Sequence, residues 1–394
     1  MQDIILPLSL EGFDLLYVKS LDNVLIWDTL APPHNLLLQK KYLCSLEAAC
    51  PEGMQMRYAI LRRNAQPIGV YSFQIKTFRL GESLHDSAQV TLGQRFKNWI
   101  KSKLAFNLII CGSVVNSGEH GFYILPESNI AAPQQAALLS SACEALSKQL
   151  GREGIRARAF LTKDYLTPKH HEWEATLSAA GFGTFQAQPG MTMQIPEAWH
   201  TFDDYLAALN AKSRTRAKRA LKKSEPIIRR ELTIEEVAVL NPRLYELYQE
   251  VARGVGFSMF VLHPDYFKIT KAAFGDEFKV FAYELDGKII AFYSTFLNKG
   301  ELECHFLGLE HAYNGTHQAY LNVLFDLVKL GIIHRCHSIN FSRTALEIKS
   351  SVGAIPNDLF FYIRHTNPIF NFLLKRFYGY FNPKDTWTPR HPFH

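Results

Sequence analysis

The stretch FKVFAYELDGKIIAFYSTFL, residues 278–297, decides the fold. Two runs rich in aromatic and β-branched residues flank an Asp-Gly pair, which favours a tight β-hairpin turn because both residues tolerate a positive φ. ELECHFLGLE (301–310) then predicts a third strand. THQAYLNVLFDLVKLG (316–331) predicts a helix that stops at a glycine, and IIHRCHSINFS (332–342) predicts a further strand.

An earlier hairpin repeats this pattern. ILRRNAQPIGVYSF begins at Ile60 and aligns with AYELDGKIIAFYST from Ala282, so that the two turns coincide. Three residue pairs are identical in this alignment: Ile68 and Ile290, Tyr71 and Tyr293, Ser72 and Ser294. After the first hairpin the chain predicts a short helix at 93–104, a strand at 105–115, a helix at 131–150 and a strand at 155–164. A single repeat of this length indicates two copies of one domain, each an α/β fold with a mixed sheet.

A basic segment, FDDYLAALNAKSRTRAKRALKK (202–223), lies between the two copies. Nine Lys/Arg and one acidic residue stand between Lys212 and Arg230, whereas the rest of the chain has 34 basic and 36 acidic residues. The same interval has no aromatic residue, which counts against base stacking on nucleic acid but leaves contact with phosphates open. We predict a basic helix at 202–223, capped by Asp203, that leads from domain 1–198 into domain 199–394.

The bulk composition narrows the class of protein. Hydrophobic residues make up 47% and charged residues 20% of the chain, which favours packed cores over disorder. No apolar run is long enough for a membrane-spanning helix, and the first residues lack the basic start of a signal peptide. Six scattered cysteines without a CxxC pair predict reduced thiols and a cytoplasmic protein. The histidines lack acidic or cysteine partners at metal-ligand spacing, so no metal is expected.

Three segments resemble the Fem-type, peptidoglycan-peptide-ligase-like branch of the bacterial GNAT superfamily. They are F-D-D-Y-L-x-x-L with K-S-R-x-x-x-K-R in the basic segment, the hairpin DGKIIAFYSTF, and EIKSSVGAIP (347–356). The resemblance covers nearly the whole chain and implies two tandem GNAT-like domains of FemAB-like architecture. It also implies an acyltransferase that moves an acyl or aminoacyl group to an amine. The implied donor is an acyl-CoA, such as acetyl-CoA, or an aminoacyl-tRNA, and the implied acceptor is a small-molecule or lipid-linked amine.

The chain departs from this family at the donor site. GNAT enzymes usually hold the CoA pyrophosphate on a [QR]-x-x-G-x-[GA] turn at the start of a helix. The second half has EHAYNGTHQAY there, with Gly315 as its one glycine, and the first half has LPESNIAAPQQ with none. We therefore expect a degenerate domain 1–198 and a donor site in 199–394. The alternative is a catalytically degenerate pair that binds an anionic ligand or tRNA.

Candidate catalytic residues follow from the resemblance and from strand positions. Lys349 matches the family's lysine and is expected to stabilise charge at the transferred carbonyl; the alternative is a solvated lysine. Glu303 and His305 share one side of strand 301–310, from which GNAT enzymes often recruit a base. The alternative for this pair is an exposed strand face.

Candidate binding residues lie at a strand end and on the basic helix. Ser342 and Arg343 end strand 332–342, where α/β sheets place ligands, although a surface salt bridge would also explain the arginine. Arg214 and Arg219 are expected to attract an anionic ligand, so that charge reversal weakens binding without unfolding the protein. The tail 367–381 predicts a helix packed on its own domain, or on a membrane or second copy, and TPRHPFH (388–394) predicts a loosely held end.

Overall fold

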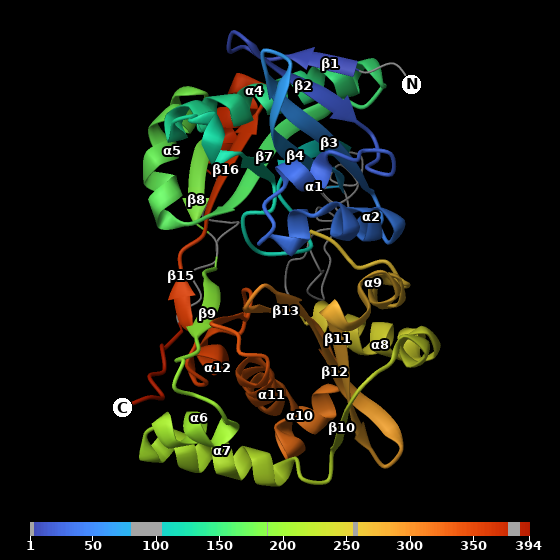
Figure 1. Cartoon of the computed structure of the whole chain (residues 1–394), viewed down its shortest axis with the longest axis vertical. Helices are drawn as coiled ribbons and strands as arrows, with labels where there is room; N and C mark the ends of the chain where they lie inside the picture. The colour runs from blue at the N-terminus through green and yellow to red at the C-terminus, as the bar shows by residue number, and fades with distance from the viewer. Residues whose placement is uncertain (1–3, 80–104, 187, 255–258, 377–386) are drawn as a thin grey trace, which may run out of the picture. The chain divides into compact units, whose positions relative to one another are not determined.

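The computed structural model describes residues 4–79, 105–186, 188–254, 259–376 and 387–394. The chain forms two compact units (Figure 1). The first comprises Met1–Ala187, Gly256–Leu262 and Asp358–Pro383, and the second comprises Gln188–Val255, His263–Asn357 and Lys384–His394. The helix predicted at 93–104 lies outside the described residues.

The first unit is built on a mixed sheet in the order β1-β2-β3-β4-β5-β7-β16-β8, with β6 paired to β4. Among the described strand pairs of this sheet, only β5 and β7 are parallel, because helix α4 carries the chain back between them. The strands are β1 (Ile4–Pro7), β2 (Phe13–Val18), β3 (Met54–Arg63), β4 (Gln66–Arg79), β5 (Ala105–Cys111), β6 (Phe122–Ile124), β7 (Ala157–Tyr165), β8 (Gly183–Gln186) and β16 (Phe360–His365).

Helices cover both faces of this sheet because its side chains alternate between them. Leu61 of β3 belongs to the core that α4 and α5 cover, whereas Tyr58 of the same strand meets Trp27 of α1, with 5.5 Å between ring centroids. The helices are α1 (Trp27–Leu30), α2 (Lys40–Ala48), α4 (Ala132–Arg152), α5 (Thr167–Ala179) and α13 (Pro368–Arg376), with 3-10 turns η1 (Leu36–Leu38) and η2 (Pro126–Ser128).

The second unit repeats this plan in a sheet of order β10-β11-β12-β13-β14-β9-β15. Again one pair is parallel, β13 with β14, and helices α10 and α11 connect the two strands. The strands are β9 (Gly190–Gln194), β10 (Ile228–Glu231), β11 (Phe278–Leu285), β12 (Lys288–Asn298), β13 (Glu301–Leu309), β14 (Ser338–Asn340) and β15 (Ile355–Asn357).

Two layers of helices enclose the second sheet as well. Leu302 lies in a core shared with α6, α7 and α11, whereas the ring of Phe292 lies 5.0 Å from that of Phe267 on α9. The helices are α6 (Phe202–Ala208), α7 (Ala211–Lys223), α8 (Ile234–Arg253), α9 (Tyr266–Phe274), α10 (His311–His317), α11 (Ala319–Ile333) and α12 (Leu346–Ser350), with the 3-10 turn η3 (Gly275–Glu277).

The two hairpins match as the sequence predicts. Asn64 and Ala65 turn the β3–β4 hairpin with φ of 49° and 66°, and Asp286 and Gly287 turn β11–β12 with φ of 51° and 75°. Both turns therefore use two consecutive left-handed residues, the geometry that matches the twist of a tight hairpin. The repeat covers turn conformation as well as strand order.

Each half of the chain contributes one strand to the sheet of the other half. β9 precedes all other elements of the second unit and lies between β14 and β15, and β16 follows them yet lies between β7 and β8 of the first sheet. The segment 182–195 therefore contributes two strands, β8 and β9, to different sheets. The compact units accordingly meet at Ala187 and Gln188 and assign Asp358–Pro383 to the first, instead of dividing the chain at 198.

Three local predictions need correction. The strand expected at 332–342 is reduced to β14, because α11 continues to Ile333. The single basic helix expected at 202–223 is two helices, and Thr201 rather than Asp203 caps the first in a capping box with Asp204. The last residues are anchored: the backbone N–H of Asn210 donates to the Pro392 carbonyl at 2.8 Å. Every described helix is too short or too polar to span a lipid bilayer.

Candidate functional site

Strands β13 and β14 part after a short parallel pairing. They are paired only from Glu301 to Glu303, opposite Ser338 to Asn340. From Cys304 to Leu309, β13 pairs with β12 on one side and with no described strand on the other. An unpaired strand edge presents backbone N–H and C=O groups that an extended ligand can bind. The candidate site begins at this parting.

Glu303 stands on the last paired position of β13, opposite Asn340. Its side chain is buried, at 9% exposure. Burial, which is the larger cause, and the nearby Glu301 together raise the pKa of this carboxyl to about 8, although hydrogen bonds to Asn340 and Asn298 oppose the rise. A carboxyl that changes its charge near pH 8 suits proton transfer to or from an amine. Glu303 is therefore the strongest acid–base candidate in the described part of the second unit.

His305 meets aromatic side chains instead of an open site. Its Nε2 lies 2.6 Å from the hydroxyl of Tyr266 on α9, and its ring lies 5.0 Å from that of Phe296. Burial lowers the pKa of the imidazole to about 3. Both His305 and Glu303 leave β13 on the side opposite the Cys304 side chain, which packs against the α11 core. The geometry favours a packing role for His305, and its predicted catalytic role stays a prediction.

Lys349 lies on α12 and turns inward. Its ammonium donates to the carbonyls of Phe341 and Arg343, both at 2.6 Å, and only 5% of the residue is exposed. Burial lowers the pKa of this amine to about 7; Cys304 raises it slightly and Arg343 lowers it. The solvated lysine considered as the alternative is excluded. Lys349 thus holds the loop that follows β14 through these two hydrogen bonds. A charged group close to the amine would change its protonation.

Ser342 and Arg343 form that loop. Ser342 has φ of 59°, and its backbone N–H donates to the Asn340 side chain at 2.9 Å. The left-handed turn directs the chain away from the sheet, so Arg343 follows the strand end at which β13 and β14 part. The structure thus brings Ser342, Arg343 and Lys349 together within one loop and helix.

Gly315 lies inside α10, where a loop was expected. A Cβ added there would have no heavy atom within 4 Å. No close approach or special backbone angle therefore requires this glycine, which is part of a regular helix instead of a phosphate-binding turn. Its predicted role in donor binding has no support from local geometry.

The two arginines of α7 differ. Arg214 donates from Nε to Leu206 O at 2.9 Å and from Nη2 to Ala207 O and Leu209 O, which satisfies the carbonyls at the end of α6. Arg219 is exposed and forms no hydrogen bond or ion pair with any described residue. Arg214 is thus engaged in holding two helices together, and Arg219 is available to a ligand.

Sequence reasoning missed the residues around Glu303. Asn298 ends β12, Asn340 ends β14, and Cys304 contributes to the electrostatic environment of Lys349. Nothing local marks them, since an asparagine before a turn has an ordinary capping use. The described residues hold no group of three or more His, Cys, Asp or Glu side chains placed to bind a metal ion.

Comparison with known proteins rests on structure. No protein-family description matches the sequence, and no curated protein matches it. Among solved structures, FemX is 13% identical, with a TM-score of 0.51 over 86% of this chain and 94% of its own. A tandem GNAT protein from the clavulanic acid biosynthesis pathway is 12% identical, with a TM-score of 0.49 over 90% of this chain and 99% of its own.

The similarity to FemX and the strand order shared by the two units both indicate a fold made of two tandem copies. The expected architecture, a mixed α/β fold with two tandem units, is confirmed by the sheets themselves. The chain has a tandem GNAT-like fold of the FemX type.

Proposed function

We propose that this chain is an acyltransferase of the GNAT/Fem type whose second unit transfers an acyl or aminoacyl group to an amine in the cytoplasm. The parting of β13 and β14 beside the buried Glu303 carries this proposal. The edge of β13 beyond Glu303, which pairs with no described strand, could take an extended donor, such as the amide-rich arm of an acyl-CoA or the ester end of an aminoacyl-tRNA. The acceptor is a small-molecule or lipid-linked amine.

Glu303 is the proposed general base. The acceptor amine attacks the donor carbonyl, its proton passes to the Glu303 carboxylate, and the thiolate or alkoxide of the donor leaves and takes up a proton. Because the pKa of Glu303 is raised to about 8, the active carboxylate becomes more abundant as the pH rises toward 8. The rate is therefore expected to rise over the same range.

Lys349 is proposed to respond to the donor's charge. A neutral amine has two N–H donors, and the carbonyls of Phe341 and Arg343 use two. The third proton of the charged form is the one that can reach an anion or a developing oxyanion. Binding of an anionic donor would therefore raise the pKa of Lys349 and add a positive charge at the strand end, beside Arg343 and Ser342.

The first test measures ligand binding and acyl transfer together. Thermal stabilisation is measured with acetyl-CoA, a longer acyl-CoA and an aminoacyl-tRNA, since a ligand of the native state raises its stability. Glu303→Gln should keep this stabilisation and lower kcat by about 10²- to 10⁴-fold. Its matched control is Glu301→Gln on the same strand, which should keep the rate and shift the pH profile to lower pH, because Glu301 raises the pKa of Glu303.

Two outcomes count against the proposal. If no donor stabilises the protein, acyl transfer by this unit is excluded for those donors. If donors bind but Glu303→Gln transfers acyl groups as fast as the parent, Glu303 is not the base. A protein that binds donors without any transfer would instead be the degenerate, ligand-binding pair.

A further inference from the structure

An open cavity of about 670 Å³ lies at the surface of the second unit, and its lining includes none of the residues at the β13–β14 parting. Its walls come from α7, from α12 and from the C-terminal segment 387–394. Arg216, Glu347, Ile348, Trp387 and Arg390 are among the residues that line it. This volume lies within the range of pockets that hold small organic ligands.

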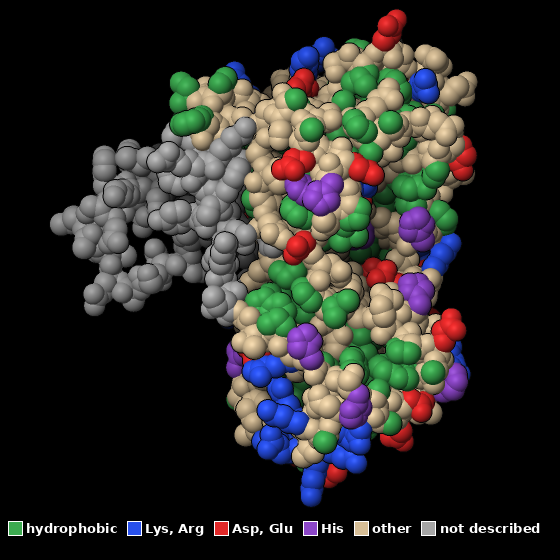
Figure 2. Space-filling model, turned by 90° about the vertical axis from the view of Figure 1, so that its left-hand side faces the viewer, with side chains coloured by type: hydrophobic (Ala, Val, Ile, Leu, Met, Phe, Trp, Pro, Cys, Tyr) green, Lys and Arg blue, Asp and Glu red, His purple; other side chains and the backbone are tan. Residues whose placement is uncertain are grey.

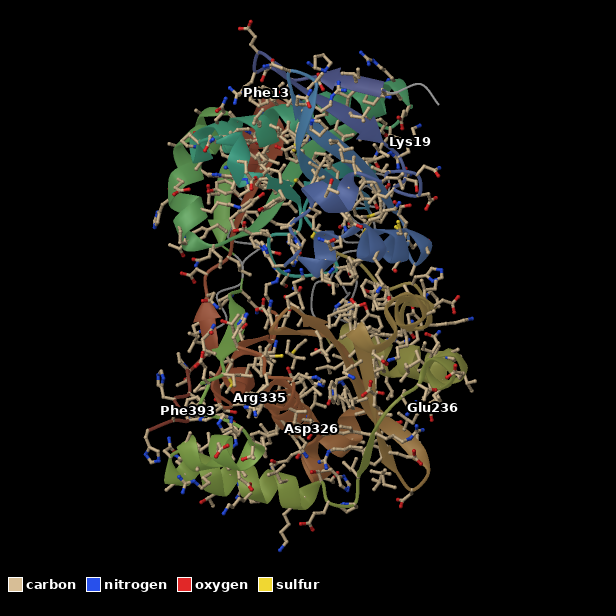
Figure 3. All side chains as sticks on the ribbon, in the orientation of Figure 1. Phe13, Lys19, Glu236, Asp326, Arg335 and Phe393 are labelled. Atoms are coloured by element: carbon tan, nitrogen blue, oxygen red, sulfur yellow. The ribbon has the colours of Figure 1, made fainter. Side chains whose placement is uncertain are left out.

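The C-terminal wall of the cavity is fixed in place. The backbone N–H of Arg390 donates to the Ser350 hydroxyl at 2.9 Å, and Asn210 donates to the carbonyls of Pro392 and His391. Phe393, labelled in Figure 3, fills the space beside Gly353, where a Cβ would come within 2.4 Å of its ring. These contacts attach the segment to both α12 and α7, so the cavity is a built feature of the unit.

The lining supplies one uncommitted cation. Arg216 is exposed, and no described residue forms a hydrogen bond or ion pair with it. Arg390 is already paired with Glu347, with 3.1 Å between Nε and Oε1. The cavity therefore offers a free guanidinium, a second one that is partly neutralised, and a carboxylate that can accept further hydrogen bonds.

The surrounding charge favours an anion. Lys212, Arg216, Arg219 and Lys223 are spaced four, three and four residues apart, so they form one stripe along α7. None of the four has a partner among the described residues. Lys and Arg side chains gather where α7 lies in the second unit (Figure 2). Like charges along one helix face raise the local concentration of anionic ligands.

The apolar part of the lining is aromatic. Trp387 packs against the core of the second unit and also faces the cavity, next to Ile348. A planar indole binds a nucleobase by stacking, and a guanidinium binds a phosphate through two parallel hydrogen bonds. A ligand with a flat ring and a phosphate uses both.

We propose that this cavity binds a nucleoside phosphate, with the phosphate on Arg216 and the base against Trp387. Glu347, held by Arg390, accepts hydrogen bonds from the ribose or from an exocyclic amine. The inference rests on the proposed function only for the identity of the natural ligand, because the two proposed donors, acyl-CoA and aminoacyl-tRNA, both contain an adenosine phosphate. α12 connects the two places, since Glu347 and Ile348 face the cavity while Lys349 reaches the loop after β14.

The test is equilibrium binding to the full chain by titration calorimetry. The probes are adenosine 5′-monophosphate, inorganic phosphate, CoA and a tRNA. Arg216→Gln should weaken adenosine monophosphate binding about 10- to 100-fold, the range of a lost charge-assisted hydrogen bond. Lys218→Gln, a control at an exposed cation of the same helix outside the cavity lining, should weaken it less than about threefold.

Variants of the ring separate stacking from charge. Trp387→Leu should weaken adenosine monophosphate about fivefold or more and leave inorganic phosphate unchanged, whereas Trp387→Phe should keep most of the affinity. If Arg216→Gln and Trp387→Leu weaken the binding of CoA, the natural ligand is an acyl-CoA. If they weaken the binding of tRNA instead, the natural ligand is the end of an RNA.

Three results would overturn the inference. They are no binding of adenosine monophosphate, equal effects of Arg216→Gln and Lys218→Gln, and unchanged binding after Trp387→Leu in a protein that melts normally. A failure of nucleoside-phosphate binding can be told apart from a failure of acyl transfer, because Glu303→Gln should lose acyl transfer and still bind the same probes with unchanged affinity. A chain that binds nucleoside phosphate but transfers no acyl group would retain this site and lose the proposed activity.

Discussion

The parallel strand pairs of the two units occupy equivalent places and end differently. In the first unit, β5 is paired with β7 up to its last residue, Cys111. In the second unit, β13 leaves β14 after Glu303 and continues for six more residues. The strand edge is thus paired to its end in the first sheet, whereas in the second sheet β13 beyond Glu303 pairs with no described strand on that side. We propose that this difference at one strand edge decides which of the two units carries the donor site.

Buried lysines show the same contrast. Lys163 donates to Ser113 O and Asn116 O in the loop after β5, and it is ion-paired with Asp164. Lys349 also donates to two loop carbonyls, but its described partners include no carboxylate. Without a counter-charge, burial lowers the pKa of Lys349 to about 7. One lysine is a structural cation, and the other can change its charge near neutral pH.

The largest effect on the free energy of unfolding is expected when Lys163, the structural cation of the first unit, is replaced. Lys163→Met leaves Asp164, which is 0% exposed, without its partner, so the free energy of unfolding should fall by about 3–5 kcal/mol. Lys349→Met removes only hydrogen bonds to carbonyls and should cost about 1–3 kcal/mol. Chemical denaturation of both variants measures the difference. The double variant Lys163→Met, Asp164→Asn should recover part of the loss, and equal losses in the two single variants would remove the contrast.

The next effect is the pH dependence of stability in the second unit. The pKa of Glu303 is raised from 4.5 to about 8 in the folded protein, so its contribution is complete below pH 4.5 and is lost as the pH rises through 8. Lys349 acts in the opposite direction: its folded pKa is lowered from 10.5 to about 7, so its contribution is present above pH 10.5 and is lost as the pH falls through 7.

Thermal melting at several pH values tests the Glu303 arm. Glu303→Gln should flatten the loss of melting temperature between pH 5 and 8 relative to the parent. Glu301→Gln keeps Glu303 and lowers its pKa, so it should flatten the same loss less than Glu303→Gln does. If Glu303→Gln and the parent melt in parallel over this range, the carboxyl does not stay protonated in the folded state.

The smallest effect separates two cations on one helix. Arg214→Ala removes hydrogen bonds to three carbonyls at the end of α6 and should lower the free energy of unfolding by about 1–2 kcal/mol. Arg219→Ala removes an unpaired surface charge and should change stability by less than about 0.5 kcal/mol. A large destabilisation by Arg219→Ala would show a hidden structural role. The predicted loss of anion binding without unfolding is therefore better tested at Arg219 than at Arg214.

Local chemistry explains which features could be predicted. Asp-Gly and Asn-Ala between β-rich runs determine two-residue turns, and helical spacing with a terminal glycine indicates α11. The capping box at Thr201 and Asp204 has a local sequence pattern as well, a threonine followed three residues later by an acid. The candidate site was only partly predictable: Glu303 was identified from strand position, whereas Asn298, Asn340 and Trp387 carry no local mark.

The sequence by itself determined the hairpins, the duplication, the mixed α/β class and the concentration of positive charge on one segment, since each depends on residues close together in the chain. Tertiary structure alone decided which strand of each half pairs in the sheet of the other half, and where β13 separates from β14. It also decided that the last residues form one wall of a cavity with α7 and α12. The physical reason is that strand partners, burial and pKa depend on groups far apart in sequence. A carboxylate or an amine shows its altered proton affinity only after the fold has removed water around it.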